Sequence, residues 1–224
     1  MSAKIGINHD MIVNTALDLA EGRGMESVTM ANIARELGIK PPSLYNHIKG
    51  LDEIRLAMAI KAQNLLYNHL KEAVNGKESG PESVKEMGKA YLSFAHQYPG
   101  LYEASLLAPD QGVSDDNQSA ESIIDLTLKA LSVYSLKQEE LIHAVRGLRS
   151  ILHGIADLDR KGGFKLQVGL IDSLEVILET FLNGLKDGGT SSPASKRRII
   201  PSLAKNSSQR NGKDQTMSSR TGNR

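Results

Sequence analysis

The sequence contains neither cysteine nor tryptophan among its 224 residues. Without cysteine the chain forms no disulfide and no thiolate metal site, which agrees with a reducing cytoplasm. No stretch approaches the roughly 18 consecutive apolar residues that a membrane-spanning helix needs. The opening residues MSAKIGINHD also lack the apolar segment of a secretory signal. These absences predict a cytoplasmic protein without membrane attachment.

Motifs that carry catalysis are missing as well. The chain has no HExxH zinc-binding pair, no glycine-rich phosphate loop and no nucleophile elbow. Its six histidines are scattered, and no two of them share a helix at a metal-ligand spacing. We therefore expect a protein that is not an enzyme and that uses neither a cofactor nor a metal.

Acidic residues outnumber basic residues outside the C-terminal tail, although the net charge of the whole chain is +1. Residues 187–224 contain eight Lys/Arg and two acidic residues, whereas the other 186 residues contain 19 basic and 24 acidic side chains. A strongly basic globular body would indicate broad affinity for nucleic acid, and it is absent. Any DNA contact must come from a local surface. The tail is rich in Ser, Gly, Asn, Lys and Arg, a composition typical of disorder.

Apolar residues recur at helical spacing along almost the whole chain, and Gly and Pro clusters divide them into segments. The pattern predicts an all-α fold of about nine helices without a convincing strand. The first helix lies between a cap at Asn8 and the glycines at 22 and 24. The others are expected at about 29–37, 41–47, 51–74, 82–97, a short one ending near 107, 119–134, 136–160 and 165–186.

The two short helices at 29–37 and 41–47 are joined by a tight turn that contains Gly38. Two such helices stacked on a first helix form a helix-turn-helix, in which the second helix enters the major groove of DNA. Pro41 and Pro42 stiffen the entry of that helix without removing a needed N–H. A DNA-contacting second helix would explain why residues 38–54, GIKPPSLYNHIKGLDEI, contain so many polar side chains.

The same segment offers groups suited to phosphates and base edges. Ser43, Asn46 and His47 carry hydrogen-bonding groups, and Lys40 and Lys49 add positive charge beside them. The predicted DNA-binding residues are Thr29, Lys40, Pro41, Pro42, Ser43, Tyr45, Asn46, His47 and Lys49. Plainer roles stay open for three of them: Thr29 as a helix cap, Tyr45 as a structural residue and His47 as a surface histidine.

The run TMANIARELGIKPPSLYNHIK, from Thr29 to Lys49, resembles the DNA-binding signature of TetR/AcrR-type transcriptional regulators. The resemblance covers residues 8 to about 60. It implies a three-helix DNA-binding domain, a helical ligand-binding body and a homodimer on a double-stranded operator. Departures from the family pattern are Lys40 in place of Ser or Thr, Ile48 in place of Phe, and Leu51 in place of Lys.

Beyond residue 51 the sequence holds four aromatic residues and a methionine that could line an apolar cavity and present a few polar groups to a ligand. These candidates are Met87, Tyr91, Phe94, Tyr98 and Tyr102. An ordinary helical core explains the same pattern. On the polar arc of the helix at 136–160, His143, Arg146 and His153 could reach an anionic ligand, although a solvated face is the alternative.

Two helices, at 136–160 and 165–186, have apolar arcs wider than one-sided packing requires. Helices of this kind can pack on their own core and on a second copy, which predicts a four-helix dimer interface. Its candidate residues are Gly147, Ile151, Gly154, Leu170, Leu174, Ile177 and Phe181. The runs HGIADLDRKGGF and AHQYPGLYEA are also similar to a TetR C-terminal subfamily marked by a His-Gly pair, the WHG subfamily.

These observations predict three parts: a helix-turn-helix DNA-binding domain at 1–50 with its motif at 29–48, a helical ligand-binding and dimerisation domain at 51–186, and a disordered basic tail at 187–224. The predicted function is a homodimeric, ligand-responsive transcriptional regulator, a repressor on a palindromic operator. Two alternatives stay open. One is a constitutive DNA-binding protein without an inducer, and the other is a helical small-molecule-binding protein whose head no longer binds DNA.

Overall fold

Helices form all the regular secondary structure of residues 6–107 and 118–188, which the computed structural model describes. Eight α-helices and three short 3-10 helices occur in these ranges, without a strand, so the predicted all-α class is confirmed there. The predicted loop at 108–117 and the tail from residue 189 onward lie outside the described residues. The elements are α1 (His9–Arg23), η1 (Met25–Ser27), α2 (Met30–Glu36), η2 (Pro41–Asn46), α3 (Leu51–Ala73), α4 (Pro81–Gln97), α5 (Pro99–Ser105), α6 (Gln118–Leu131), η3 (Ser132–Tyr134), α7 (Gln138–Arg160) and α8 (Leu170–Gly188).

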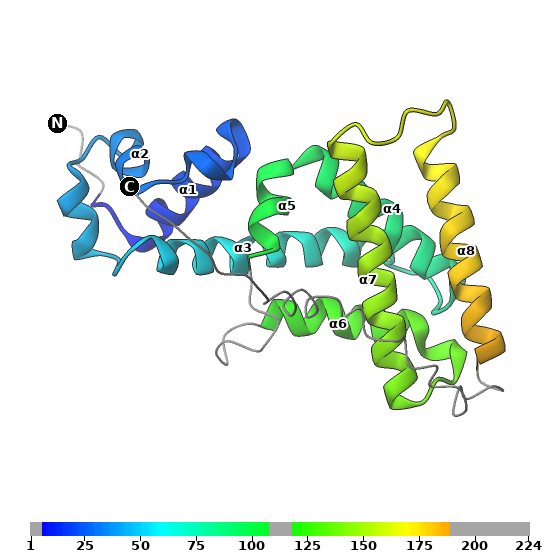
Figure 1. The fold of residues 1–224 in the computed structure, drawn as a ribbon. Coiled ribbons are helices and arrows are strands. Elements are labelled where there is room, and N and C mark those ends of the chain that lie inside the picture. The colour runs from blue at the N-terminus through cyan, green and yellow to red at the C-terminus, as the bar shows by residue number, and fades with distance from the viewer. Residues whose placement is uncertain (1–5, 108–117, 189–224) are drawn as a thin grey trace, which may run out of the picture. The chain divides into compact units, whose positions relative to one another are not determined.

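The N-terminal elements enclose a small apolar core, and we call residues 8–62 the head (Figure 1). The cap Asn8 starts α1 by accepting a hydrogen bond from the Met11 amide at 2.9 Å. Gly24, at φ +83°, ends the same helix. The core of the head consists of buried residues from α1 to the first half of α3, together with one residue of α5: Ile12, Val13, Ala16, Leu17, Leu19, Ala20, Val28, Ile33, Ala34, Leu44, Ile48, Ile54, Met58, Ala62 and Ala104.

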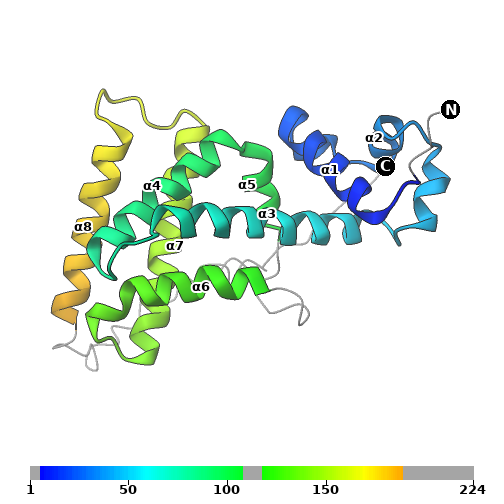
Figure 2. The ribbon, with the colours of Figure 1, turned by 180° about the vertical axis from the view of Figure 1, so that it is seen from behind.

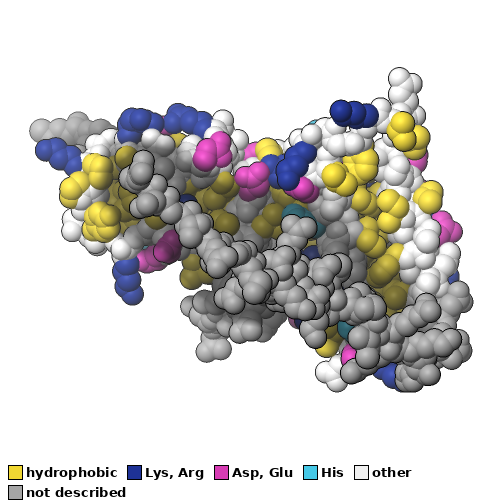
Figure 3. Space-filling view, viewed as in Figure 1, with side chains coloured by type: hydrophobic (Ala, Val, Ile, Leu, Met, Phe, Trp, Pro, Cys, Tyr) yellow, Lys and Arg dark blue, Asp and Glu magenta, His cyan; other side chains and the backbone are white. Residues whose placement is uncertain are grey.

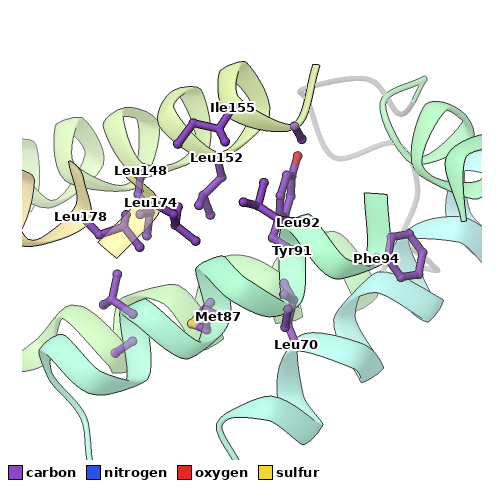
Figure 4. Packing of buried hydrophobic residues seen from close by; sticks show 14 of the residues in the cluster. Leu70, Met87, Tyr91, Leu92, Phe94, Leu148, Leu152, Ile155, Leu174 and Leu178 are labelled. Atoms are coloured by element: carbon purple, nitrogen blue, oxygen red, sulfur yellow. The ribbon is translucent and has the colours of Figure 1, made fainter. Parts of the chain in front are cut away.

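We call residues 63–188 the body. Its core lies between the second half of α3 and the helices α4, α6, α7 and α8. In Figure 4 leucines of α7 and α8 point toward one another and toward α4. Leu148 and Leu152 come from α7, and Leu174 and Leu178 from α8, where both are fully buried. Gly88 lets α4 approach them, because a Cβ there would lie 2.8 Å from the nearest Leu178 atom.

Helix α3 links the head to the body (Figures 1 and 2). Its first half supplies Ile54 and Met58 to the core of the head, and its second half supplies Leu66 and Leu70 to the core of the body. The core of the head therefore continues past residue 50, where the sequence predicts a domain boundary. Because one unbroken helix serves both cores, a tilt of α3 in the body moves the head with it.

Helix α5 makes a second link, through a close contact with α1. The Glu21 carboxylate of α1 accepts hydrogen bonds from the Gly100 and Leu101 amides, both at 3.0 Å. These amides belong to the first turn of α5, where N–H groups have no partner within the helix and attract negative charge. Glu21 thus caps a helix 79 residues away in the chain.

The contact also depends on a glycine. A Cβ on Gly100 would lie 2.4 Å from the backbone carbon of Ala20 and from the amide nitrogen of Glu21. Both atoms are backbone atoms of a helix, so neither can move aside on its own. The structure therefore requires glycine at position 100 to bring α5 onto α1.

Two predicted elements differ from the structure. The third helix is the 3-10 helix η2, whose first hydrogen bond joins the Ser43 amide to the Lys40 carbonyl at 2.9 Å. The last helix begins at Leu170, five residues later than the apolar pattern suggested. Residues 161–169 are exposed throughout and contain three glycines, one of them Gly162 at φ +67°, so the chain there has little apolar contact to hold a helix.

Replacing Gly100 with Ala should force α5 away from α1 and break the Glu21 cap. Overpacking of this kind costs about 1–3 kcal/mol of unfolding free energy, which urea denaturation would measure. Gly22→Ala is the matched control, because no atom lies within 4 Å of a Cβ at that exposed position of α1. Equal stability of the two variants would contradict the close packing.

Candidate nucleic-acid interface and internal cavity

The segment 40–49 is divided into a buried side and an exposed side. Leu44 and Ile48 are 0% and 4% exposed and anchor the segment in the core of the head. Tyr45 is 60% exposed, and Asn46 and His47 are exposed beside it. Apolar anchors thus hold the polar side chains outward, as a surface that contacts a ligand as large as a duplex requires.

The start of η2 has no side-chain cap, because Lys40 occupies the N-cap position. Pro41 and Pro42 offset this loss: neither has an N–H, so two of the first-turn donors that would need a partner do not exist. The Lys40 side chain is exposed and remains available for an anion. The tandem prolines therefore replace a cap and leave a cation at the tip of the recognition segment.

Thr29 caps α2, and its hydroxyl accepts a hydrogen bond from the Asn32 amide at 3.2 Å. This is the role that the sequence left open for it, and its hydroxyl is exposed enough to reach a phosphate as well. At the other end of the segment, the Lys49 amide donates to the Glu53 carboxylate at 2.6 Å. Glu53 therefore fixes the turn that leads from η2 into α3.

Of the nine predicted DNA-binding residues, Tyr45, Asn46, His47 and Lys49 line one shallow surface hollow together with Ile48 and Glu53. Ser43 is half-buried, and the other eight are exposed. Two cations, Lys40 and Lys49, flank hydroxyl, amide and imidazole groups. Such a surface can donate to phosphate oxygens from its cations and exchange hydrogen bonds with base edges from its neutral groups.

A partly open cavity of about 170 Å³ lies between α3, α4, α5, α6 and α7. Its wall is mostly aliphatic, with a few polar groups. The described lining residues are Gln63, Leu66, Leu70, Met87, Tyr91, Ser105, Leu106, Ile123, Ile124, Thr127, Val145, Leu148, Arg149 and Leu152. A concave, largely apolar site with a few fixed polar groups is the usual form of a small-molecule site.

A chain of polar side chains leads from this cavity toward α7. The Tyr91 hydroxyl donates to the Tyr102 hydroxyl at 3.3 Å, and Tyr102 Oη lies 2.6 Å from His153 Nδ1. Burial raises the pKa of both tyrosines above the ordinary value, so both stay protonated near neutral pH. The Arg160 guanidinium lies 5.4 Å from the centre of the Tyr102 ring.

The predicted ligand residues divide into three groups. Met87 and Tyr91 line the cavity, and Tyr102 and His153 are bonded behind Tyr91. Phe94 and Tyr98 lie apart from it: Phe94 packs between the rings of His69 and Tyr98, and Figure 4 shows it away from Met87. His143 and Arg146 are exposed on α7 and do not line the cavity.

Four polar lining residues were not predicted: Gln63, Ser105, Thr127 and Arg149. Gln63 carried a usable signal, because it sits at helical spacing between the buried residues Ala59 and Leu66 of α3. A polar residue on an apolar stripe marks either a core hydrogen bond or a cavity wall. The other three reach the cavity only through tertiary packing.

Helices α7 and α8 leave an apolar surface uncovered, which Figure 3 shows as yellow side chains. Leu158, Ile171, Val176 and Ile177 are each at least 40% exposed there. Of the predicted interface residues, Ile177 is exposed, Ile151, Gly154 and Leu170 are half-buried, and Gly147 is covered by the ring of Phe181 in the same chain. Leu174 is fully buried in its own chain and does not face a partner.

No group of three histidine, aspartate or glutamate residues is placed to hold a metal ion among residues 6–107 and 118–188. In the same residues no helix combines the length and apolarity needed to cross a membrane.

Comparison with known families matches both parts of the chain. Residues 12–58 match the bacterial regulatory proteins of the tetR family, and residues 84–181 match the tetracyclin repressor-like C-terminal domain. The first match covers the helix-turn-helix, and the second covers α4 to most of α8.

Individual relatives agree with these matches. The uncharacterised HTH-type transcriptional regulator YobS of Bacillus subtilis (strain 168) is 36% identical over 188 residues, 83% of this chain and 96% of that protein. The HTH-type transcriptional repressor DrrR1 of Streptomyces coeruleorubidus is 25% identical over 136 residues, 61% of this chain and 47% of that protein. A TetR variant from Acinetobacter baumannii AYE, solved in complex with minocycline, shares the fold with a TM-score of 0.61 at 16% identity, over 83% of this chain and 100% of that one.

Tyr45→Ala and His47→Ala should each remove a polar contact with duplex DNA while leaving the fold intact, since both side chains are exposed. Loss of a hydrogen bond to a charged phosphate costs about 1.5–3 kcal/mol, roughly a tenfold to hundredfold loss of affinity, which fluorescence anisotropy would measure. Tyr67→Phe, which removes a hydroxyl from α3 outside the head, is the control. Wild-type affinity in both head variants would refute the assignment.

Proposed function

Because the chain belongs to the TetR family of bacterial helix-turn-helix transcriptional regulators, we propose that it binds a palindromic operator as a homodimer and releases it when a small molecule fills the cavity. The family is one of regulators and not of enzymes. The observation that carries the proposal is that two helices, α3 and α5, contact both the cavity and the head. Both α3 and α5 contribute residues to the cavity wall and to the core or contact surface of the head.

Regulation by release follows from this sharing. In α3, Gln63 and Leu66 line the cavity, and Met58, two turns earlier, belongs to the core of the head. In α5, Ser105 lines the cavity, and Gly100 rests on α1. A ligand that requires a different spacing of these helices favours a different position of the head. Coupling of about 1–3 kcal/mol would change operator affinity about 5- to 150-fold.

The uncovered apolar surface of α7 and α8 supports a homodimer. Leu158, Ile171, Val176 and Ile177 are exposed on α7 and α8, and a second copy packed on these helices would bury them. A dimer would place two heads on half-sites about 34–36 Å apart, which is one turn of DNA. The operator would then be a palindrome.

Repression and effector binding rest on relatives. DrrR1 is named a repressor, and the TetR variant was solved with minocycline, a small molecule. We propose for this chain that the free protein holds its operator and that a small molecule acts as effector. We do not propose that this molecule is minocycline. The inferred place in the His-Gly subfamily agrees with the position of His153, which holds Tyr102 behind the cavity.

The decisive experiment is selection of random duplexes with the purified chain, followed by footprinting and by sizing of the complex. We expect a protected palindrome with half-sites one turn apart and two chains per site. The operator would then be titrated against a panel of small molecules in parallel with thermal shift. Binding of a panel member without release would favour a carrier, and operator binding that no compound alters would favour a constitutive DNA-binding protein.

The Glu21 cap gives a test that needs no identified effector. Operator binding to the wild-type chain should slow hydrogen exchange at the Gly100 and Leu101 amides, because Glu21 joins them to the head. Glu21→Ala should accelerate exchange at both amides and remove most of the effect of DNA. Asp18→Ala is the control, since Asp18 lies exposed one turn earlier on α1. An undiminished DNA effect in Glu21→Ala would exclude α5 as the connection.

A further inference from the structure

The two hydroxyl groups of the cavity wall, those of Ser105 and Thr127, already donate their protons to backbone carbonyls. The Ser105 hydroxyl donates to the Tyr102 carbonyl at 2.6 Å, and the Thr127 hydroxyl donates to the Ile123 carbonyl at 2.8 Å. Both bonds are of the local kind that serine and threonine make within helices. Each oxygen then has only lone pairs to offer to a molecule in the cavity.

Gln63 presents an acceptor that has no partner at all among the described residues. Its Nε2 donates to the Ser105 carbonyl at 3.3 Å, while its Oε1 is buried and unbonded. Exchanging the two amide atoms would not help, because the Ser105 carbonyl can only accept and would face an oxygen. A buried unpaired amide oxygen is costly, and a bound donor would remove that cost.

Tyr91 completes the pattern. Its hydroxyl donates to Tyr102, so its oxygen keeps only lone pairs and can act as an acceptor. The remaining polar lining residue is Arg149, which is exposed and therefore lies at the rim. Its positive charge acts on Tyr91, where it lowers the pKa against the larger effect of burial. A cationic donor such as an ammonium group is disfavoured beside this charge.

We infer that the cavity takes a small uncharged molecule with an apolar body and a hydroxyl group, of the phenol class, whose proton is donated to Gln63 Oε1 and its neighbouring oxygens. The inference rests on the proposed role of this cavity as the effector site. It assigns the chemical class that the family relationship leaves open. The aliphatic walls from Leu66, Leu148 and Leu152 accommodate the ring.

The size of the cavity agrees with this class. Its volume of about 170 Å³ is close to that of an engineered apolar cavity of roughly 150 Å³ that holds benzene. One ring with one or two small substituents therefore fits. A purely apolar ring would fill the space but would leave Gln63 Oε1 without a partner, so the hydroxyl supplies the selectivity.

The test compares three probes on the full chain: p-cresol and p-xylene have nearly equal shape, and 4-methylanisole is larger by one methyl group. In p-cresol the hydroxyl is present, in p-xylene a methyl group replaces it, and in 4-methylanisole the oxygen remains but the proton is gone. We expect p-cresol to bind at least about tenfold more tightly than either analogue in calorimetry, the factor that one satisfied hydrogen bond provides. Equal binding of p-cresol and p-xylene, or no binding of p-cresol, would overturn the inference.

Gln63→Leu keeps the approximate volume and removes the unpaired oxygen. It should leave thermal stability at or above the wild-type value and reduce the preference for p-cresol over p-xylene to about twofold or less. Gln97→Leu, at an exposed end of α4, is the control for added hydrophobicity. If Gln63→Leu does not fold, Thr127→Val removes a second acceptor at nearly constant shape and should lower the same ratio. A full preference in a folded Gln63→Leu variant would also overturn the inference.

Failure of this inference can be separated from failure of the proposed function. Selective binding of p-cresol without any change in operator affinity would retain the ligand class and refute ligand-responsive regulation. Release of the operator by other compounds, combined with absent or unselective p-cresol binding, would retain the regulator and refute the class. Operator release by p-cresol but not by p-xylene would support both.

Discussion

At Gly100 the backbone of α5 lies directly against the backbone of α1, and the position of the head relative to the body depends on this contact. Gly100 has no Cβ, so the two backbones meet at a distance that any other residue would prevent. Glu21 then caps the two amides that this approach presents, so burial of the first turn of α5 leaves no donor unsatisfied. A contact made by two backbones and one carboxylate has little freedom to slide. Motion of α5 must therefore be shared by α1 or break the cap.

The second link, α3, contributes buried residues to both cores, so a shift of α3 in one core also changes its packing in the other. Its buried side changes from Ile54 and Met58 to Leu66 and Leu70 along one continuous helix, and Gln63 lies near the change. A core built only for stability would place an apolar residue there, since Gln63 leaves an unpaired buried oxygen. Natural proteins tolerate such local costs mainly at functional sites. The position of Gln63, beside a cavity and between two domains, agrees with a functional reason.

The head could be predicted closely from the sequence, because its signals are local. A glycine at position 38, prolines at 41 and 42 and apolar anchors at 44 and 48 determine the turn, the entry of η2 and the exposed side without reference to distant residues. The cavity could not be predicted in the same way. Phe94 and Tyr98 are as aromatic as Tyr91, yet only tertiary packing decides that Phe94 packs on His69 and Tyr98 on Phe94, and that neither lines the cavity. The apolar arc of α8 likewise predicted an interface but could not show that Leu174 is fully buried in its own chain while Ile177 is exposed.

Helix α5 is too short to be stable alone, and this explains why it can transmit a signal. Isolated helices shorter than about 12 residues are marginal in water, and α5 has seven. Its persistence depends on partners along its length: Glu21 at its first turn, and farther along the bonds of Tyr102 with Tyr91 and of the Ser105 carbonyl with Gln63, two residues of the cavity wall. A molecule that alters the wall changes the support at one end, and the free energy of the whole helix changes with it. The other end rests on α1, so a molecule bound in the cavity, as we propose, would also change the stability of the contact with the head.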